Sequence, residues 1–105
     1  MLNVLMEFRK GILFVRLYGS LNNDTIKKFK TDVKEVIINV GIKYVVLNIE
    51  SLSSISQEGI KEIKLIRKIL EKKEGQFFLF GGEIKELKKL VSLENELKVF
   101  EKVVI

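Results

Sequence analysis

The chain has 105 residues, of which 47% are hydrophobic, and it carries a net charge of +5. This length fits one ordinary domain, and this apolar content predicts a packed core. Cysteine and histidine are both absent, which excludes disulfides, thiol chemistry, histidine bases and zinc sites built on Cys or His. A metal site would need carboxylates alone. The acidic residues lie among lysines, as on a solvated helix surface, so we expect neither a metal nor a cofactor.

The positive charge permits an acidic partner, but no phosphate-binding or nucleic-acid motif accompanies it, so we expect no nucleic-acid partner. No apolar stretch approaches the roughly 18 residues that suggest a membrane span. The N-terminal sequence MLNVLMEFRK reaches charge too early for a secretory signal. We therefore expect a cytoplasmic protein that does not insert into membranes.

The first two predicted elements form a hairpin. Residues 3–8 alternate in polarity with a period of two, which is typical of a strand. Lys10-Gly11 is a turn signal, so Ile12–Tyr18 should pair with this strand, and Gly19 should end the second strand.

An amphipathic helix should follow, because SLNNDT is a helix-start signal with Asn22, Asn23 or Asp24 as the candidate N-cap. Gly41 is placed to end the helix with a positive φ. Apolar residues at three- and four-residue steps predict its buried stripe: Ile26, Phe29, Val33, Ile37 and Val40.

The rest of the chain alternates strands and helices. The nearly continuous apolar run Tyr44–Ile49 predicts a strand buried on both faces. Gln76–Phe80 predicts a second buried strand, which Gly81-Gly82 should end. Between them a helix from about Gln57 should be closed by Gly75 and should turn four residues inward: Ile60, Ile63, Ile66 and Leu70. A third helical pattern carries Ile84, Leu87 and Val91, and the tail LKVFEKVVI has mixed helix and strand periodicity. The order β-β-α-β-α-β-α-(β) predicts one α/β domain with a mixed central sheet, with helices packed on it.

The turn SISQEG joins the first buried strand to its helix. Ser54 and Gln57 fit a capping box, S-x-x-Q, and Ser56 is an alternative N-cap. Glu58 would then be an acid in the first helical turn, which the helix dipole stabilises by about 0.3–1 kcal/mol. The simplest interpretation of this turn is therefore a well-capped helix start.

The same region carries a family resemblance. VVLNIESLSSISQEGIKEI resembles the central signature of STAS domains, which occur in bacterial anti-sigma factor antagonists. Leu47-Asn48-Ile49 stands at the strand end, Leu52-Ser53 at the turn entry and Gly59 at the family's glycine. Upstream, VRLYGSLNNDTIKKF is similar to a second family pattern; the matching positions are Gly19, Leu21, Thr25 and Phe29, with Asn22 in place of the usual Asp. The resemblance implies a single STAS-like domain over residues 1–105.

The sequence departs from the family at its functional centre. In typical members a kinase-type anti-sigma factor phosphorylates a serine just before the glycine, which weakens their complex. This chain has Glu58 there, without a hydroxyl. The resemblance implies that Glu58 imitates the phosphorylated state in part, with about one negative charge against the roughly 1.5–2 of phosphoserine. Ser56 is the candidate for a displaced acceptor, although phosphoryl transfer demands a held position.

Lys61, Lys64, Lys68 and Lys72 lie three and four residues apart and so share one helical face. A solvated surface is the ordinary interpretation. The alternative is a docking face for an acidic partner, next to the turn of Ser54, Ser56, Gln57, Glu58 and Gly59.

The resemblance implies a non-enzymatic protein-binding module of bacterial transcription regulation, whose partner is an anti-sigma factor of the serine-kinase type or a related regulator. One alternative is a STAS subunit with a structural role in a transporter or signalling assembly. An enzymatic or small-molecule-binding α/β domain is a third hypothesis, and the sequence shows no paired base and nucleophile in its favour.

Overall fold

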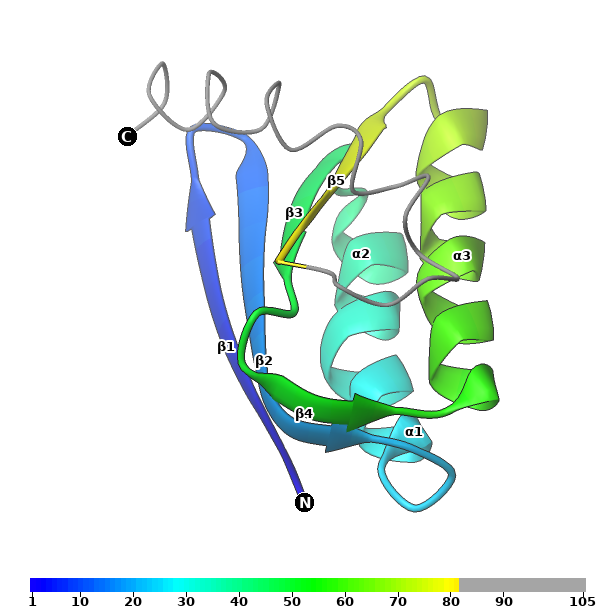
Figure 1. Ribbon diagram of the computed structural model, residues 1–105. Helices are drawn as coiled ribbons and strands as arrows, with labels where there is room; N and C mark the ends of the chain where they lie inside the picture. The colour runs from blue at the N-terminus through cyan, green and yellow to red at the C-terminus, as the bar shows by residue number, and fades with distance from the viewer. Residues whose placement is uncertain (82–105) are drawn as a thin grey trace.

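The computed structural model describes residues 1–81. The third helical pattern and the tail, at residues 82–105, lie outside the described residues. The described elements follow one another as β1 (Leu2–Arg9), β2 (Ile12–Leu21), α1 (Ile26–Phe29), the π-helical η1 (Lys30–Lys34), α2 (Glu35–Val40), β3 (Tyr44–Asn48), β4 (Leu52–Ile55), α3 (Gln57–Lys72) and β5 (Gln76–Phe80) (Figure 1). The short strand β4 is the one described strand that the sequence analysis did not predict.

The strands form a mixed sheet in the order β1-β2-β3-β5, and β4 pairs with β2 beside that path. β1 is antiparallel to β2, whereas β3 and β4 run parallel to β2 and β5 runs parallel to β3. Val45, Val46 and Leu47 of β3 are all buried, as the apolar run predicted. The predicted mixed sheet, with buried strands at Tyr44 and Gln76, is confirmed.

The hairpin turns at Lys10 and Gly11, whose φ angles are +51° and +83°. Two successive positive φ values are the signature of the tight type I′ turn that joins two strands. The prediction that Gly19 ends β2 is wrong, because β2 runs on to Leu21. β4 pairs with this last part of β2, and the register of the pairing shifts between Gly19 and Ser20. The positive φ of Gly19 accommodates this irregularity.

α1 begins at Ile26 with Thr25 as its N-cap, so the prediction that Asn22, Asn23 or Asp24 caps this helix is wrong. The Asn22 side-chain oxygen instead accepts hydrogen bonds in the turn before the helix, from the backbone N–H groups of Asp24 (2.9 Å) and Thr25 (3.2 Å). Phe29, Val33 and Ile37 are buried in the predicted stripe. Val40 was wrongly placed in that stripe, since it is 67% exposed. The left-handed Gly41 turns the chain after it, and the buried residue at this end is Ile42.

The helices lie together on one face of the sheet (Figure 1). Their buried residues form one core cluster with the sheet residues that point the same way, among them Leu13, Val15, Leu47 and Leu79. A second, smaller cluster of Ile12, Val46 and Phe78 lies on the opposite face. The prediction that both helices pack on the same sheet is confirmed.

α3 ends at Lys72 rather than at Gly75. The residue with a positive φ after it is Glu74 (+62°). Gly75 has a different role, because a side chain at this position would collide with the backbone carbonyl of Lys43. The same carbonyl accepts a 2.9 Å hydrogen bond from the N–H of Gln76, so the absent side chain lets β5 begin beside β3.

Candidate functional site

The two sequence patterns that resemble the STAS family meet in space at the start of α3. Leu52–Ile55 of β4 pairs with Gly19–Leu21 of β2. One residue later, the N–H of Ser56 donates a 2.8 Å hydrogen bond to the carbonyl of Leu21. The turn that leads into α3 is therefore fixed to the end of β2 by backbone hydrogen bonds, which gives its exposed side chains a rigid base.

Ser56 caps α3. Its backbone is extended (φ −88°, ψ 169°), and its hydroxyl oxygen accepts a 3.2 Å hydrogen bond from the N–H of Gly59. The capping box of Ser54 with Gln57 does not form, because β4 holds Ser54 in a strand and its hydroxyl bonds to that of Ser20 at 3.0 Å. Of the two predicted caps, the structure therefore selects Ser56.

Three serine hydroxyls gather where β4 pairs with β2, two of them on exposed residues and that of Ser20 on a half-buried one. Ser53 donates to the carbonyl of Gly19 at 2.9 Å, and the Ser20 oxygen lies 3.3 Å from that of Ser53 and 3.0 Å from that of Ser54. Ser20 was not among the predicted site residues. It lies far from this turn in the sequence, and only the missed strand β4 brings it close.

Gly59 is buried in the first turn of α3, and packing explains why a glycine stands there. A Cβ atom at this position would lie 2.9 Å from both Cγ1 of Ile55 and Cγ of Leu21. Such contacts are too short for carbon atoms, which prefer about 3.5–4.0 Å. The missing side chain thus allows the helix start to rest directly on the ends of β2 and β4.

Gln57 and Glu58 both point to solvent at the start of the helix. The Glu58 carboxylate lies 3.5 Å from the ammonium of Lys61, and the two side chains are 55% and 72% exposed. An ion pair this exposed contributes little to stability. The Glu58 carboxylate therefore remains accessible to a partner surface, on a backbone that the cap and Gly59 hold in place.

The lysines predicted to share a face are all exposed on α3, opposite its buried isoleucines. Apart from Glu58, which contacts Lys61, the acids of this helix pair with residues outside the lysine face. Glu62 contacts Lys30 and Lys34 of η1 at 3.5 Å each, and Glu71 contacts Arg67 at 2.8 Å. Within the described part of the chain, three lysines of this face form no ion pair: Lys64, Lys68 and Lys72.

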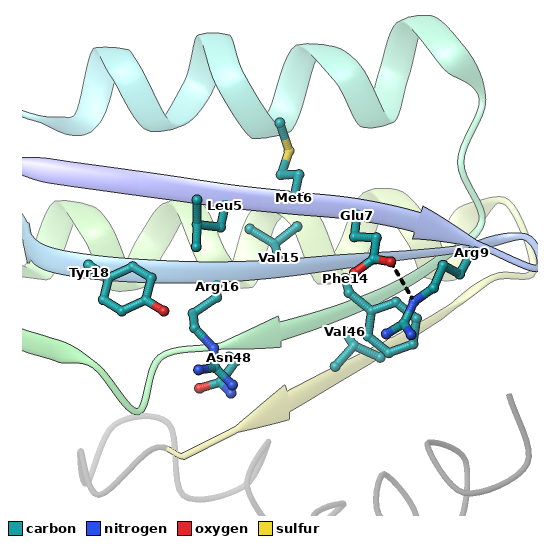
Figure 2. A pocket seen from close by; sticks show the side chains of 10 residues that line it. All are labelled: Leu5, Met6, Glu7, Arg9, Phe14, Val15, Arg16, Tyr18, Val46 and Asn48. Carbon is teal, nitrogen blue, oxygen red and sulfur yellow. Dashed lines mark ion pairs between the residues drawn. The ribbon is translucent and has the colours of Figure 1, made fainter. Parts of the chain in front are cut away.

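A hollow of about 460 Å³ lies on the sheet face opposite the helices, over β1, β2 and β3 (Figure 2). Arg9 borders it, with its guanidinium 4.8 Å from the centre of the Phe14 ring and 3.2 Å from the Glu7 carboxylate. Arg16 and Asn48 line its other side. The sequence analysis did not predict this hollow, because it depends on which strands are neighbours.

Across residues 1–81, no helix is both long enough and apolar enough to cross a membrane. The fold is similar to that of the anti-sigma factor antagonist SpoIIAA in its unphosphorylated form, with a TM-score of 0.73, 17% identity, and coverage of 98% of this chain and 97% of that one. It is equally similar to the Bacillus cell fate determinant SpoIIAA in the phosphorylated form (TM-score 0.73, 16% identity, 96% and 99% covered). An anti-sigma factor antagonist from Mycobacterium paratuberculosis gives a TM-score of 0.69 at 16% identity, with 99% and 83% covered.

At these identities the structural likeness establishes the fold. A sequence model described as the STAS domain matches residues 3–104, almost the whole chain. The chain therefore belongs to the STAS domain family.

Proposed function

We propose that this chain is a protein-binding regulatory module of the anti-sigma factor antagonist type. In this proposal its partner is an anti-sigma factor of the serine-kinase type or a related regulator. The contact surface is the turn of Ser54, Ser56, Gln57, Glu58 and Gly59, referred to below as the regulatory turn. The observation that carries the proposal is the exposed carboxylate of Glu58 on the first turn of α3, next to a glycine that packing requires.

The proposed activity is constitutive binding rather than a phosphorylation cycle. Glu58 has no hydroxyl to accept a phosphoryl group. The hydroxyl of Ser56 is used as the cap of α3, so a phosphate there would replace the hydrogen bond that fixes the turn. The negative charge at the regulatory turn is thus permanent, and it sets one binding strength instead of switching between two.

The lysine face, Lys61, Lys64, Lys68 and Lys72, extends this surface along α3. Because Lys64, Lys68 and Lys72 form no ion pair within residues 1–81, their ammonium groups favour an acidic patch on the partner. Charge complementarity of this kind acts mainly on the rate of association and on the choice of partner. We therefore propose that the lysine face guides the partner, while the regulatory turn determines how tightly it is held.

The test is to capture the partner from a native lysate, identify it, and measure its affinity for purified variants by calorimetry. The double variant Lys64→Glu/Lys68→Glu should weaken binding at least tenfold at low salt, and the loss should shrink as salt is added. Lys27→Glu/Lys28→Glu on α1 is the matched control, because both lysines are exposed and the change in net charge is the same. Equal affinities of the two double variants would contradict the docking face.

A further inference from the structure

We propose that the exposed edge of β1 pairs with β1 of a second copy of this chain, antiparallel and in the register that places Met6 opposite Met6. This surface lies away from the regulatory turn and does not depend on the proposed partner. Within the described sheet β1 is an edge strand. Its eight residues give an edge about 27 Å long at a rise of about 3.4 Å per residue.

The edge has little of the usual protection against pairing. Natural edge strands are protected by charged side chains, above all lysine, by proline or by a bulge. The two charged residues of β1, Glu7 and Arg9, lie near its end and pair with each other at 3.2 Å. Leu2–Arg9 contains no proline or lysine, and its pairing with β2 runs without a register shift. Alternate backbone N–H and C=O groups of β1 thus face outward along an uninterrupted strand.

Apolar side chains line the same edge. Met6 and Phe8 pair with Val15 and Leu13 of β2, so they point to the side of the sheet that the helices cover. Met6 is nevertheless 41% exposed and Phe8 57% exposed. Figure 2 shows Met6 leaving β1 on that side. On the other face Leu5 is 58% exposed, so the edge strand presents large apolar groups on both of its faces.

The strand is complementary to itself. A twofold axis perpendicular to the sheet makes the two edges antiparallel and keeps both helix layers on one side. With Met6 opposite Met6, Phe8 of each copy faces Val4 of the other, which joins the exposed apolar side chains in one row. On the other face Leu5 meets Glu7 of the second copy. Centring the register on Glu7 would place two carboxylates opposite each other, which destabilises a strand pair.

This self-complementarity favours a second copy over a foreign strand as the occupant. The contact is narrow, because it joins two strand edges and the side chains beside them. Stable dimers bury at least about 1,200 Å², and we expect this contact to bury less. The dimer should therefore be weak and should form in a concentration-dependent manner.

Cysteine cross-linking tests the register, because the chain has no cysteine of its own. In Met6→Cys the two Cβ atoms should lie about 4.5–5.5 Å apart, close to the spacing of a disulfide. In Phe8→Cys the two thiols should be roughly 14 Å apart, since four residues of strand rise separate them. Both positions are exposed on the same face, which makes them a matched pair. Mild oxidation should link Met6→Cys into a covalent dimer and leave Phe8→Cys monomeric.

Sedimentation of the unmodified chain over a wide concentration range should show the mass rising from 12.1 kDa toward twice that value. Met6→Lys should remain monomeric, and its thermal melt will show that it folds. A constant monomer mass for the unmodified chain would overturn the proposal. So would cross-linking of Phe8→Cys as readily as Met6→Cys.

Discussion

Replacing Gly59 with alanine should destabilise the protein, although alanine is the better helix former. The added Cβ would lie 2.9 Å from atoms of both Ile55 and Leu21, and overpacking a core costs about 1–3 kcal/mol. Alanine recovers up to about 1 kcal/mol of helix propensity. The net loss in the free energy of unfolding should therefore be about 1 kcal/mol, which lowers Tm by roughly 4 °C in a domain of this size.

Thermal and urea unfolding of a double-mutant cycle would measure this effect. Ile55→Ala removes one of the two close neighbours, so adding Gly59→Ala to that variant should cost less than adding it to the unmodified chain. Contacting residues show coupling energies of about 0.5–3 kcal/mol in such cycles. A Tm that stays the same or rises in Gly59→Ala would refute the packing explanation of this glycine.

Three further substitutions probe the same framework, each measured by urea unfolding. Ser56→Ala should lower the free energy of unfolding by about 1 kcal/mol through loss of the cap. Ser54→Ala should lower it by less than about 0.5 kcal/mol, because Ser54 does not cap the helix. Equal losses for the two variants would contradict the assignment of Ser56 as the cap. Glu62→Gln, which removes the charge between two lysines, should cost about 1 kcal/mol at low salt and less at high salt, and a salt-independent loss would count against an ionic origin. Gly75→Ala should cost about 1–3 kcal/mol because its side chain would meet a backbone carbonyl, and a neutral result would contradict that contact.

Much of the fold could be predicted because apolar periodicity reports burial directly. The run around Val45 and Leu47 and the stripe from Ile60 to Leu70 indicated the sheet and the helix that the structure shows. The prediction that Val40 is buried was wrong, because periodicity does not show where a helix ends relative to the core. The turn at Gly41 puts Ile42 into the core at that end of the helix.

The candidate site was predictable only in part. The residues of the regulatory turn followed from helix capping and from the family patterns, and both of these are local in sequence. Strand β4 was missed because its four residues, LSSI, are too few and too polar to show a period. Without β4, neither the contact of Ser54 with Ser20 nor the packing of Gly59 on Leu21 could be foreseen, because both depend on pairing between distant segments.

The measurement that tests the proposed function most directly is the affinity of the captured partner for the unmodified chain, Glu58→Ser and Glu58→Gln. In the proposed complex, a kinase partner would present nucleotide phosphates and acidic groups near this position. Like charges that face each other across an interface cost several kcal/mol, and about 1.4 kcal/mol corresponds to a tenfold change in affinity. Both variants should therefore bind at least about tenfold more tightly, with thermal melts close to that of the unmodified chain. With ATP, only Glu58→Ser should gain a phosphate at residue 58. Unchanged or weaker binding of both variants would contradict a permanent negative charge that sets the strength of this interface.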